Sequence, residues 1–245
     1  MNRKEFSSHV SASYNLYLED LFNQILEMGG LVERQLQTSV LSVQNADAEL
    51  AKEVIQLDKL VNREEMEIDR LCVRVLARQQ PTASDLRLIV SAIRIAVDLE
   101  RMGDEIVKIS GLVLRLADRG DLDCQNLQGY KQLVEISSRA RDMLKNVLDA
   151  FTRLDLSGAA AVIEEEEHVD DLFAVAMEEV TERFKESHND IECLLQLVYA
   201  LRAAERITDH ARNIAESVVY LVNGQDMRNM NDDLLADFLK SLTVN

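Results

Sequence analysis

The sequence predicts an all-α protein built from two tandem, homologous three-helix bundles with long antiparallel helices. Its 245 residues contain one proline and eight glycines, too few for the many turns of a sheet protein. Apolar residues recur at steps of three and four over long stretches, and short acidic motifs occupy matching places in both halves. A few long helices, duplicated once, account for these observations.

Breaks in the apolar periodicity mark the ends of the expected helices. Pro81 forces a turn because proline cannot continue a helix interior, and Arg119-Gly120-Asp121 ends the helix that follows. Met28-Gly29-Gly30 lies inside the first helix, where it would admit a close neighbouring helix or a bend. Helices are therefore expected at about 14–43, 48–79, from just after the Pro81-Thr82 turn to about 118, 126–153, 157–186 and 190–222, with a further short one at 232–242.

A residue-by-residue repeat relates the two halves. A shift of 105 positions, from 100 to 205, places Glu100-Arg101-Met102-Gly103-Asp104 on Glu205-Arg206-Ile207-Thr208-Asp209. In the preceding helix a shift of 108, from 58 to 166, places Asp58 and its neighbours on Glu166 and its neighbours. The difference between the two shifts indicates a small change in loop length. The expected units are a first bundle at 14–119, a second bundle at 124–222, and terminal extensions at 1–13 and 223–245.

Composition limits the class of protein. The net charge of −17 repels phosphate backbones, and no Lys/Arg run exceeds Arg3-Lys4, so we expect no nucleic-acid partner. No stretch approaches the roughly 18–20 apolar residues of a membrane span, and the N-terminus lacks the apolar core of a signal peptide. Cys72, Cys124 and Cys193 form no metal-binding pattern and are expected to be buried, unpaired side chains. These features favour a cytoplasmic location.

Four short acidic pairs at i,i+4 spacing form the candidate site. They are Asp58/Asn62, Glu100/Asp104, Glu166/Asp170 and Glu205/Asp209. Each pair interrupts an apolar ladder; in the third helix this ladder is distinct from a polar, solvated stripe. That polar stripe runs through Arg87, Arg94, Asp98, Arg101, Glu105 and Lys108, and the apolar ladder through Leu86, Val90, Ile93, Val97, Glu100, Asp104, Val107, Gly111 and Leu114. In the fifth helix the interrupted ladder contains Ala159, Ile163, Glu166, Asp170, Phe173 and Met177.

Antiparallel hairpins should bring the acidic pairs together. Around the turn near Pro81, residues at equal height have numbers that add to about 162, and around the turn near His188 to about 375. The first relation pairs two helices of the first bundle, and the second pairs two helices of the second bundle. The resulting clusters are Asp58, Asn62, Glu100 and Asp104 in the first bundle, and Glu166, Asp170, Glu205 and Asp209 in the second.

Clustered carboxylates repel one another unless water, arginine or a cation compensates their charge. Oxygen ligands suit Mg, Ca or Mn, and carboxylates also bind Fe or Zn, so all eight residues are candidate metal ligands. Two alternatives remain open. Acidic i,i+4 pairs are common on solvated helix faces, and Arg202 and Arg212 flank the second cluster closely enough to form salt bridges with it. Asn62 also leaves the first cluster with one charge fewer.

Other polar groups carry weaker signals. His168 and His210 adjoin the clusters but are expected to be ordinary surface or hydrogen-bonding residues, and Glu65-x-x-x-Asp69 is expected to be a solvated run. The sequence contains no glycine-rich phosphate loop, no GxSxG and no Cys/His nucleophile pattern, so we predict no catalytic residues and no organic cofactor.

The segments DLERMGDEIVKIS and AAERITDHARNIAES resemble the two signatures of the PhoU family, whose hallmark is a repeated E(D)-x-x-x-D motif. LEMGGLVE, near residue 26, resembles that family's first helix, and the likeness covers about residues 14–222. The resemblance implies a cytoplasmic, homodimeric accessory protein that keeps the phosphate regulon off when phosphate is plentiful. It also implies two partners, the ATPase subunit of the phosphate ABC transporter and the phosphate sensor histidine kinase, and metal binding by some members at the acidic motifs.

Two other classes of function compete with this interpretation. A carboxylate-bridged di-metal oxidase requires Glu-x-x-His pairs, but Gly103 and Thr208 stand at the histidine position. A plain helical scaffold would use the acidic pairs for solubility and helix register only. Metal content would separate the scaffold from a metal-bearing adaptor.

Overall fold

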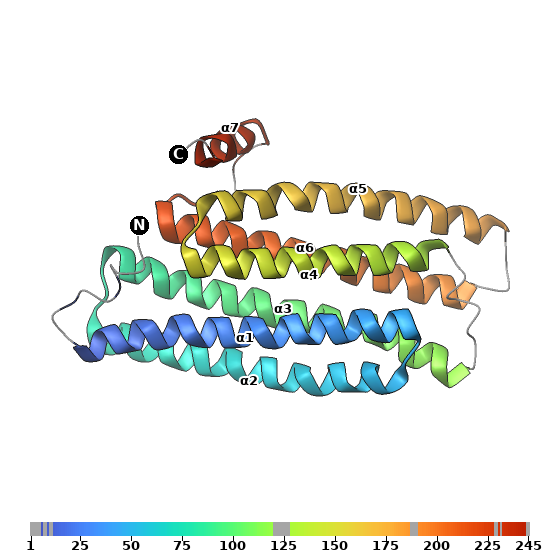
Figure 1. Ribbon diagram of the computed structural model, residues 1–245, viewed down its shortest axis with the longest axis horizontal. Coiled ribbons are helices and arrows are strands. Elements are labelled where there is room, and N and C mark those ends of the chain that lie inside the picture. Colours follow the sequence, from blue (N-terminus) through green and yellow to red (C-terminus); the bar gives the residue numbers. More distant parts are fainter. Residues whose placement is uncertain are drawn as a thin grey trace.

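The computed structural model describes residue 6, residue 9 and residues 12–119, 128–186, 191–227, 230 and 232–243. This part of the chain contains seven α-helices and no strand. Three helices form one layer and three form a second layer against it, while the seventh lies beside α5 (Figure 1). The helices are α1 (Ala12–Asn45), α2 (Ala48–Gln79), α3 (Ala83–Arg119), α4 (Gln128–Arg153), α5 (Leu156–Glu186), α6 (Ile191–Asn223) and α7 (Asp232–Thr243).

The predicted all-α class is confirmed, and the predicted helix ends agree with the observed ones to within two residues. Residues 126 and 127, where the fourth helix was expected to begin, lie outside the described residues. Each layer is an antiparallel three-helix bundle, with α1–α3 in the first and α4–α6 in the second (Figure 1).

The turns that open α2 and α5 are duplicates of each other. Ala46 and Leu154, separated by the repeat shift of 108, both have a positive φ, of 49° and 55°. Asp47 follows as the N-cap of α2, and its carboxylate accepts hydrogen bonds from two backbone N–H groups of the first turn, at 2.9 and 3.2 Å. Asp155 caps α5 in the same manner, accepting from the backbone N–H of Ser157 at 3.0 Å. The repeat therefore extends to the chemistry of the turns.

The glycine pair in α1 admits a neighbouring helix, as one of the two predicted alternatives required. A Cβ atom built on Gly29 would lie 2.6 Å from Cδ2 of Leu148 on α4, whereas one built on Gly30 would meet nothing within 4 Å. Only Gly29 is therefore needed for the approach of α4 to α1.

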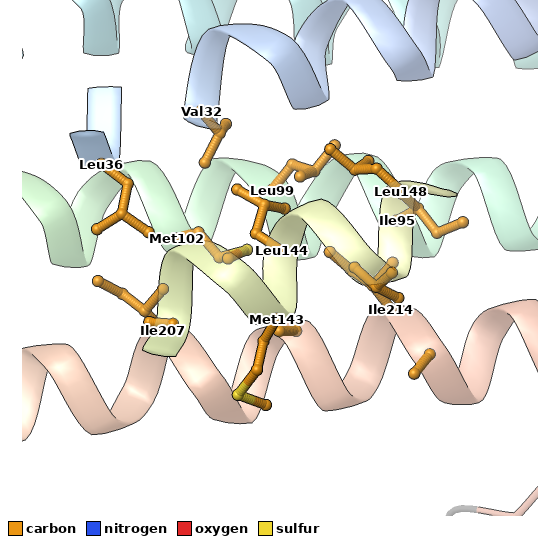
Figure 2. Packing of buried hydrophobic residues seen from close by; sticks show 14 of the residues in the cluster. Val32, Leu36, Ile95, Leu99, Met102, Met143, Leu144, Leu148, Ile207 and Ile214 are labelled. Atoms are coloured by element: carbon orange, nitrogen blue, oxygen red, sulfur yellow. The ribbon is translucent and has the colours of Figure 1, made fainter. Parts of the chain in front are cut away.

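A single core joins the two bundles. α3 and α6 make the most extensive contact of any helix pair, and α1 also packs against α4. Figure 2 shows the labelled side chains from these four helices meeting between the layers, where Leu99, Leu144 and Ile207 are fully buried. Each Å² of apolar surface that this shared core removes from water favours the association of the two bundles by about 25 cal/mol.

The polar stripe of α3 was predicted to be solvated, and this prediction is wrong for most of its length. Asp98 and Glu105 face α6, where Asp98 accepts from His210 at 2.9 Å and Glu105 pairs with Arg206 at 3.3 Å. The apolar ladder is in turn less buried than the bundle core, since Leu86 and Val97 are each 41% exposed. The reason is that α3 contacts the second bundle as well as its own, so the face opposite its own bundle core is covered.

The cysteines depart in part from the prediction. Cys72 is buried and free, as predicted, but Cys193 is disulfide-bonded, which contradicts the prediction of three unpaired cysteines. As for the membrane, none of the described helices is both long enough and apolar enough to cross a bilayer.

Candidate carboxylate clusters

Three of the predicted ligands converge in the second bundle. Glu166 and Asp170 project from one turn of α5 towards Asp209 on α6, and one carboxylate oxygen from each lies within 4.8 Å of the others. The i,i+4 spacing places the first two on one helical stripe, and the antiparallel α5–α6 hairpin supplies the third. The predicted pairing across this hairpin is thus present in the structure.

Glu205 is the most perturbed carboxyl group of this cluster. One oxygen accepts a hydrogen bond from Arg202 at 2.7 Å, while the other, Oε2, is buried and has no hydrogen-bond partner. Burial, followed by the negative charge of Asp209, raises the pKa of Glu205 to about 7. Near neutral pH this group is therefore divided between its neutral and ionised forms.

Arginine compensates part of the negative charge, as the sequence allowed. Arg212 on α6 lies 2.5 Å from Glu166, and Arg202 pairs with Glu205. Burial nevertheless raises the pKa of Glu166 against the effect of Arg212, and burial and Asp209 raise the pKa of Asp170. Four carboxylates and two guanidinium groups leave an excess of negative charge when all are ionised.

The first cluster is assembled from α2 and α3 around a buried amide. Gln35 of α1 donates to Asp58 at 3.3 Å, and Asn62 donates to the other oxygen of Asp58 at 3.4 Å. Burial raises the pKa of Asp58 in spite of these hydrogen bonds, with a further contribution from Asp104. Burial and then Asp104 raise the pKa of Glu100. The predicted pairing across the α2–α3 hairpin is also present.

The two clusters differ in how closely the acids approach. Within the described ranges, one group of at least three acidic, cysteine or histidine side chains has ligand atoms within 4.8 Å of one another. It consists of Glu166, Asp170 and Asp209. Asn62 takes the place of Asp170 in the first cluster. The histidines behave as expected, since His210 binds Asp98 and the exposed His168 contacts a backbone carbonyl at 3.0 Å.

Two residues of the first cluster were not singled out in the sequence. Gln35 is fully buried, and Gly103 leaves room for it because a Cβ there would lie 3.2 Å from Gln35 Oε1 and 3.0 Å from Asp58 Oδ1. The signal for Gln35 was a polar residue within the apolar row of α1 that contains Val32 and Leu36. Thr208 occupies the matching place in the second bundle and donates to the backbone carbonyl of Glu205 at 2.6 Å.

The donor atoms fit a cation that prefers oxygen. Three buried oxygens in the two clusters have no hydrogen-bond partner: Oε2 of the Glu205 carboxylate and the amide oxygens of Asn62 and Gln35. Buried acceptors without a donor are costly, and a bound cation would satisfy them. The set contains no thiolate, so it favours hard or borderline ions over soft ones.

A family model described as the PhoU domain matches residues 25–113 and again residues 133–218. The chain belongs to the PhoU family. Each PhoU match spans most of one three-helix bundle and contains one carboxylate cluster, which confirms the resemblance inferred from the paired motifs. The relatives are named as accessory or regulatory proteins, and this member of the family is not an enzyme.

Individual PhoU proteins are similar over nearly the full length of the chain. A phosphate-specific transport system accessory protein PhoU homolog from Pseudomonas putida is 40% identical over 230 residues, covering 94% of this chain and 88% of that protein. The phosphate-specific transport system accessory protein PhoU of Escherichia coli (strain K12) is 36% identical over 242 residues, covering 98% and 97%.

Two crystal structures share the fold. PhoU from Pseudomonas aeruginosa superposes with a TM-score of 0.82 at 42% identity and covers 86% of this chain and 100% of its own. The phosphate transport system regulatory protein PhoU from Streptococcus pneumoniae gives 0.78 at 30% identity, covering 86% and 98%.

Proposed function

We propose that the protein is a cytoplasmic accessory factor of phosphate transport that represses the phosphate regulon when phosphate is plentiful. The supporting observation is the full-length similarity to proteins named as phosphate-specific transport system accessory proteins, together with both PhoU domains. In this role it acts as an adaptor between the ATPase subunit of the phosphate ABC transporter and the phosphate sensor histidine kinase.

The charge of the molecule suits such an adaptor. With a net charge of −17, its helical faces would engage basic surfaces on both partners. Association driven by complementary charge is fast at low salt and slows as ionic strength rises, because mobile ions screen the attraction. A homodimer would present each face twice.

Binding to the purified ATPase subunit and to the cytoplasmic part of the kinase tests the adaptor role directly. We expect both to bind in surface plasmon resonance, with association rates that fall between 50 and about 500 mM salt while dissociation rates change less. Sedimentation of the protein alone reports whether it is a dimer. An adaptor must bind both partners, so failure to bind even one of them at low salt would refute this role.

We also propose that the two carboxylate clusters bind metal ions such as Mg, Mn, Fe or Zn. The ligands would be Glu166, Asp170, Glu205 and Asp209 in the second bundle, and Asp58, Asn62, Glu100 and Asp104 in the first. A bound cation would neutralise the clustered charge and cross-link neighbouring helices; we assign it no catalytic step. Because three acidic oxygens already converge in the second bundle, that cluster is expected to bind more tightly.

Elemental analysis of untagged protein, before and after dialysis against a chelator, tests this second proposal. Glu205→Ala combined with Asp209→Ala should lower the metal content of the second bundle while the helical circular dichroism signal stays unchanged. Glu178→Gln together with Glu182→Gln, two exposed carboxylates on α5, provides a control with the same change in charge. Unchanged metal content in the first variant would remove the second cluster from the proposal, and metal-free wild type under all conditions would favour the plain scaffold.

A further inference from the structure

A basic cleft lies between the two bundles, near the C-terminal end of α3 and the N-terminal end of α6. Figure 1 shows these two helix ends at the same end of the molecule. Its volume is about 560 Å³, and it is formed by residues of α2, α3 and α6. Four cationic side chains and a single acid line it, although the whole chain carries a net charge of −17. The charged lining consists of Lys108, Arg115, Arg202, Arg206 and Glu105.

The acid in the cleft fixes two of the cations. Glu105 is only 4% exposed, and it binds Lys108 at 2.8 Å and Arg206 at 3.3 Å. Arg202 is held by Glu205 outside the cleft at 2.7 Å. Arg115 has no ion pair or hydrogen bond in the described part of the chain, so its guanidinium group is available to a ligand. One acid cannot neutralise four cations, and an electropositive lining remains.

The remaining wall offers an aromatic ring and apolar surface. Tyr199 is 57% exposed, and Ile55 and Val107 lie on the opposite helices. The side-chain oxygen of Gln196 is buried without a hydrogen-bond partner. An exposed aromatic ring beside several arginines is the combination that binds a flat organic group attached to phosphates.

The internal repeat supplies a comparison within the same chain. The shift of 105 relates Arg94 to Tyr199 and Arg115 to Tyr220. The far end of the α3–α6 contact therefore also has an arginine on α3, Arg94, and a tyrosine on α6, Tyr220. There, Arg94 stacks over the ring of Tyr220 at 4.9 Å and pairs with Asp226 at 3.7 Å.

Two small residues, Ala203 and Gly111, help to keep the cleft open at its own end. Ala203 corresponds to Asp98, which at the far end binds His210. Gly111 corresponds to Glu216, which at the far end lies 3.4 Å from Arg212. At the far end, Arg94 contacts Tyr220 and Asp98 contacts His210, so side chains fill the space between α3 and α6. The matching positions at the near end line the cleft instead.

We propose that this cleft binds a phosphorylated small molecule of nucleotide size. Arg115, Arg206 and Lys108 would hold the phosphate groups, since arginine matches phosphate oxygens with two parallel hydrogen bonds. Tyr199 would pack against the organic group. A volume of about 560 Å³ falls within the roughly 300–1,000 Å³ of small-molecule sites and is far larger than a single phosphate ion requires. This ligand role goes beyond the proposed adaptor and metal-binding functions.

Isothermal titration calorimetry of the full chain with ATP, AMP, adenosine and inorganic phosphate tests the proposal. We expect ATP to bind with a dissociation constant below about 1 mM, AMP more weakly, and adenosine or inorganic phosphate much more weakly still. Arg115→Gln should weaken ATP binding at least about tenfold, because it removes a charge-assisted hydrogen bond. Arg74→Gln, an equal charge change on the exposed face of α2, should leave binding unchanged.

Gly111→Glu provides a second, independent variant that reproduces the residue type found at the far end of the molecule. A Cβ at this position would meet only the end of the Arg115 side chain, at 3.4 Å, so the fold should tolerate it. The new carboxylate should pair with Arg115 and abolish ATP binding. The proposal is overturned if ATP does not bind, or if neither variant weakens it. Inorganic phosphate binding as tightly as ATP would overturn the assignment of an organic ligand, and binding of polyglutamate in place of ATP would assign the cleft to an acidic protein segment.

Discussion

Glu205 should make the stability of the metal-free protein depend on pH. Its pKa is raised from 4.5 to about 7 in the folded protein, so the folded state binds the proton more tightly than the unfolded chain. Stability from this group is therefore greatest below pH 4.5, falls as the pH rises towards 7, and is constant above it. Glu205→Gln removes the titrating group while keeping a side chain of the same size.

The size of the effect follows from the change in pKa. A rise from 4.5 to about 7 corresponds to about 3 kcal/mol as an upper limit. Water at the neighbouring exposed Asp170 screens part of this, and we expect about 2 kcal/mol between pH 5 and pH 8. Relative to wild type, Glu205→Gln should thus gain about 2 kcal/mol on going from pH 5 to pH 8, whatever constant cost the lost contact with Arg202 imposes.

Urea unfolding followed by circular dichroism, in chelator-treated buffer of constant ionic strength, measures this difference. Wild type, Glu205→Gln and the exposed control Glu178→Gln should each be compared at pH 5 and pH 8. The control should show no such gain. An equal stability difference between Glu205→Gln and wild type at both pH values would refute the reasoning, because it would mean that Glu205 ionises equally readily in the folded and unfolded states.

Three further predictions concern the clusters and the helix contacts. The apparent affinity of the second cluster for Mn²⁺ should fall as the pH drops below about 7, since Glu205 must lose its proton to bind the ion, and titration calorimetry between pH 6 and 8 would detect this; affinity independent of pH would contradict it. Gly29→Ala should be less stable than Gly30→Ala by about 1 kcal/mol or more in urea unfolding, because only the first Cβ collides with Leu148, and equal stability would show that α4 adjusts freely. Asp47→Ala should lower stability by about 1 kcal/mol through loss of the α2 cap, whereas Asp47→Asn should cost less, and equal losses would exclude the cap as the cause.

Much of the fold was predictable because its signals are local. Pro81 and the turn around Asp47 end helices through the chemistry of a few neighbouring residues. The meeting of Glu166 with Asp209 was also predictable, because their numbers add to the 375 expected for residues at equal height in this antiparallel helix pair. The geometry of the two helical hairpins was therefore sufficient to predict which residues form the clusters.

The docking of the two bundles could not be predicted in the same way. Asp98 and Glu105 have the spacing of a solvated helix face, and nothing near them in the sequence indicates that α6 covers them. His210 was recognised as a hydrogen-bonding residue, but its partner lies 112 positions away on the other bundle. Gln35 was missed for a related reason, since a single amide in an apolar row does not show which groups it will meet. Contacts between units depend on surface complementarity that helical periodicity does not describe.

The most direct test of the proposed function is alkaline phosphatase activity of the source bacterium, grown in phosphate-rich medium, with and without this gene. Repression of the phosphate regulon predicts high activity in the deletion strain and low activity after complementation with the wild-type gene. Low activity in the deletion strain, with no effect of complementation, would contradict the proposed role and favour the plain helical scaffold.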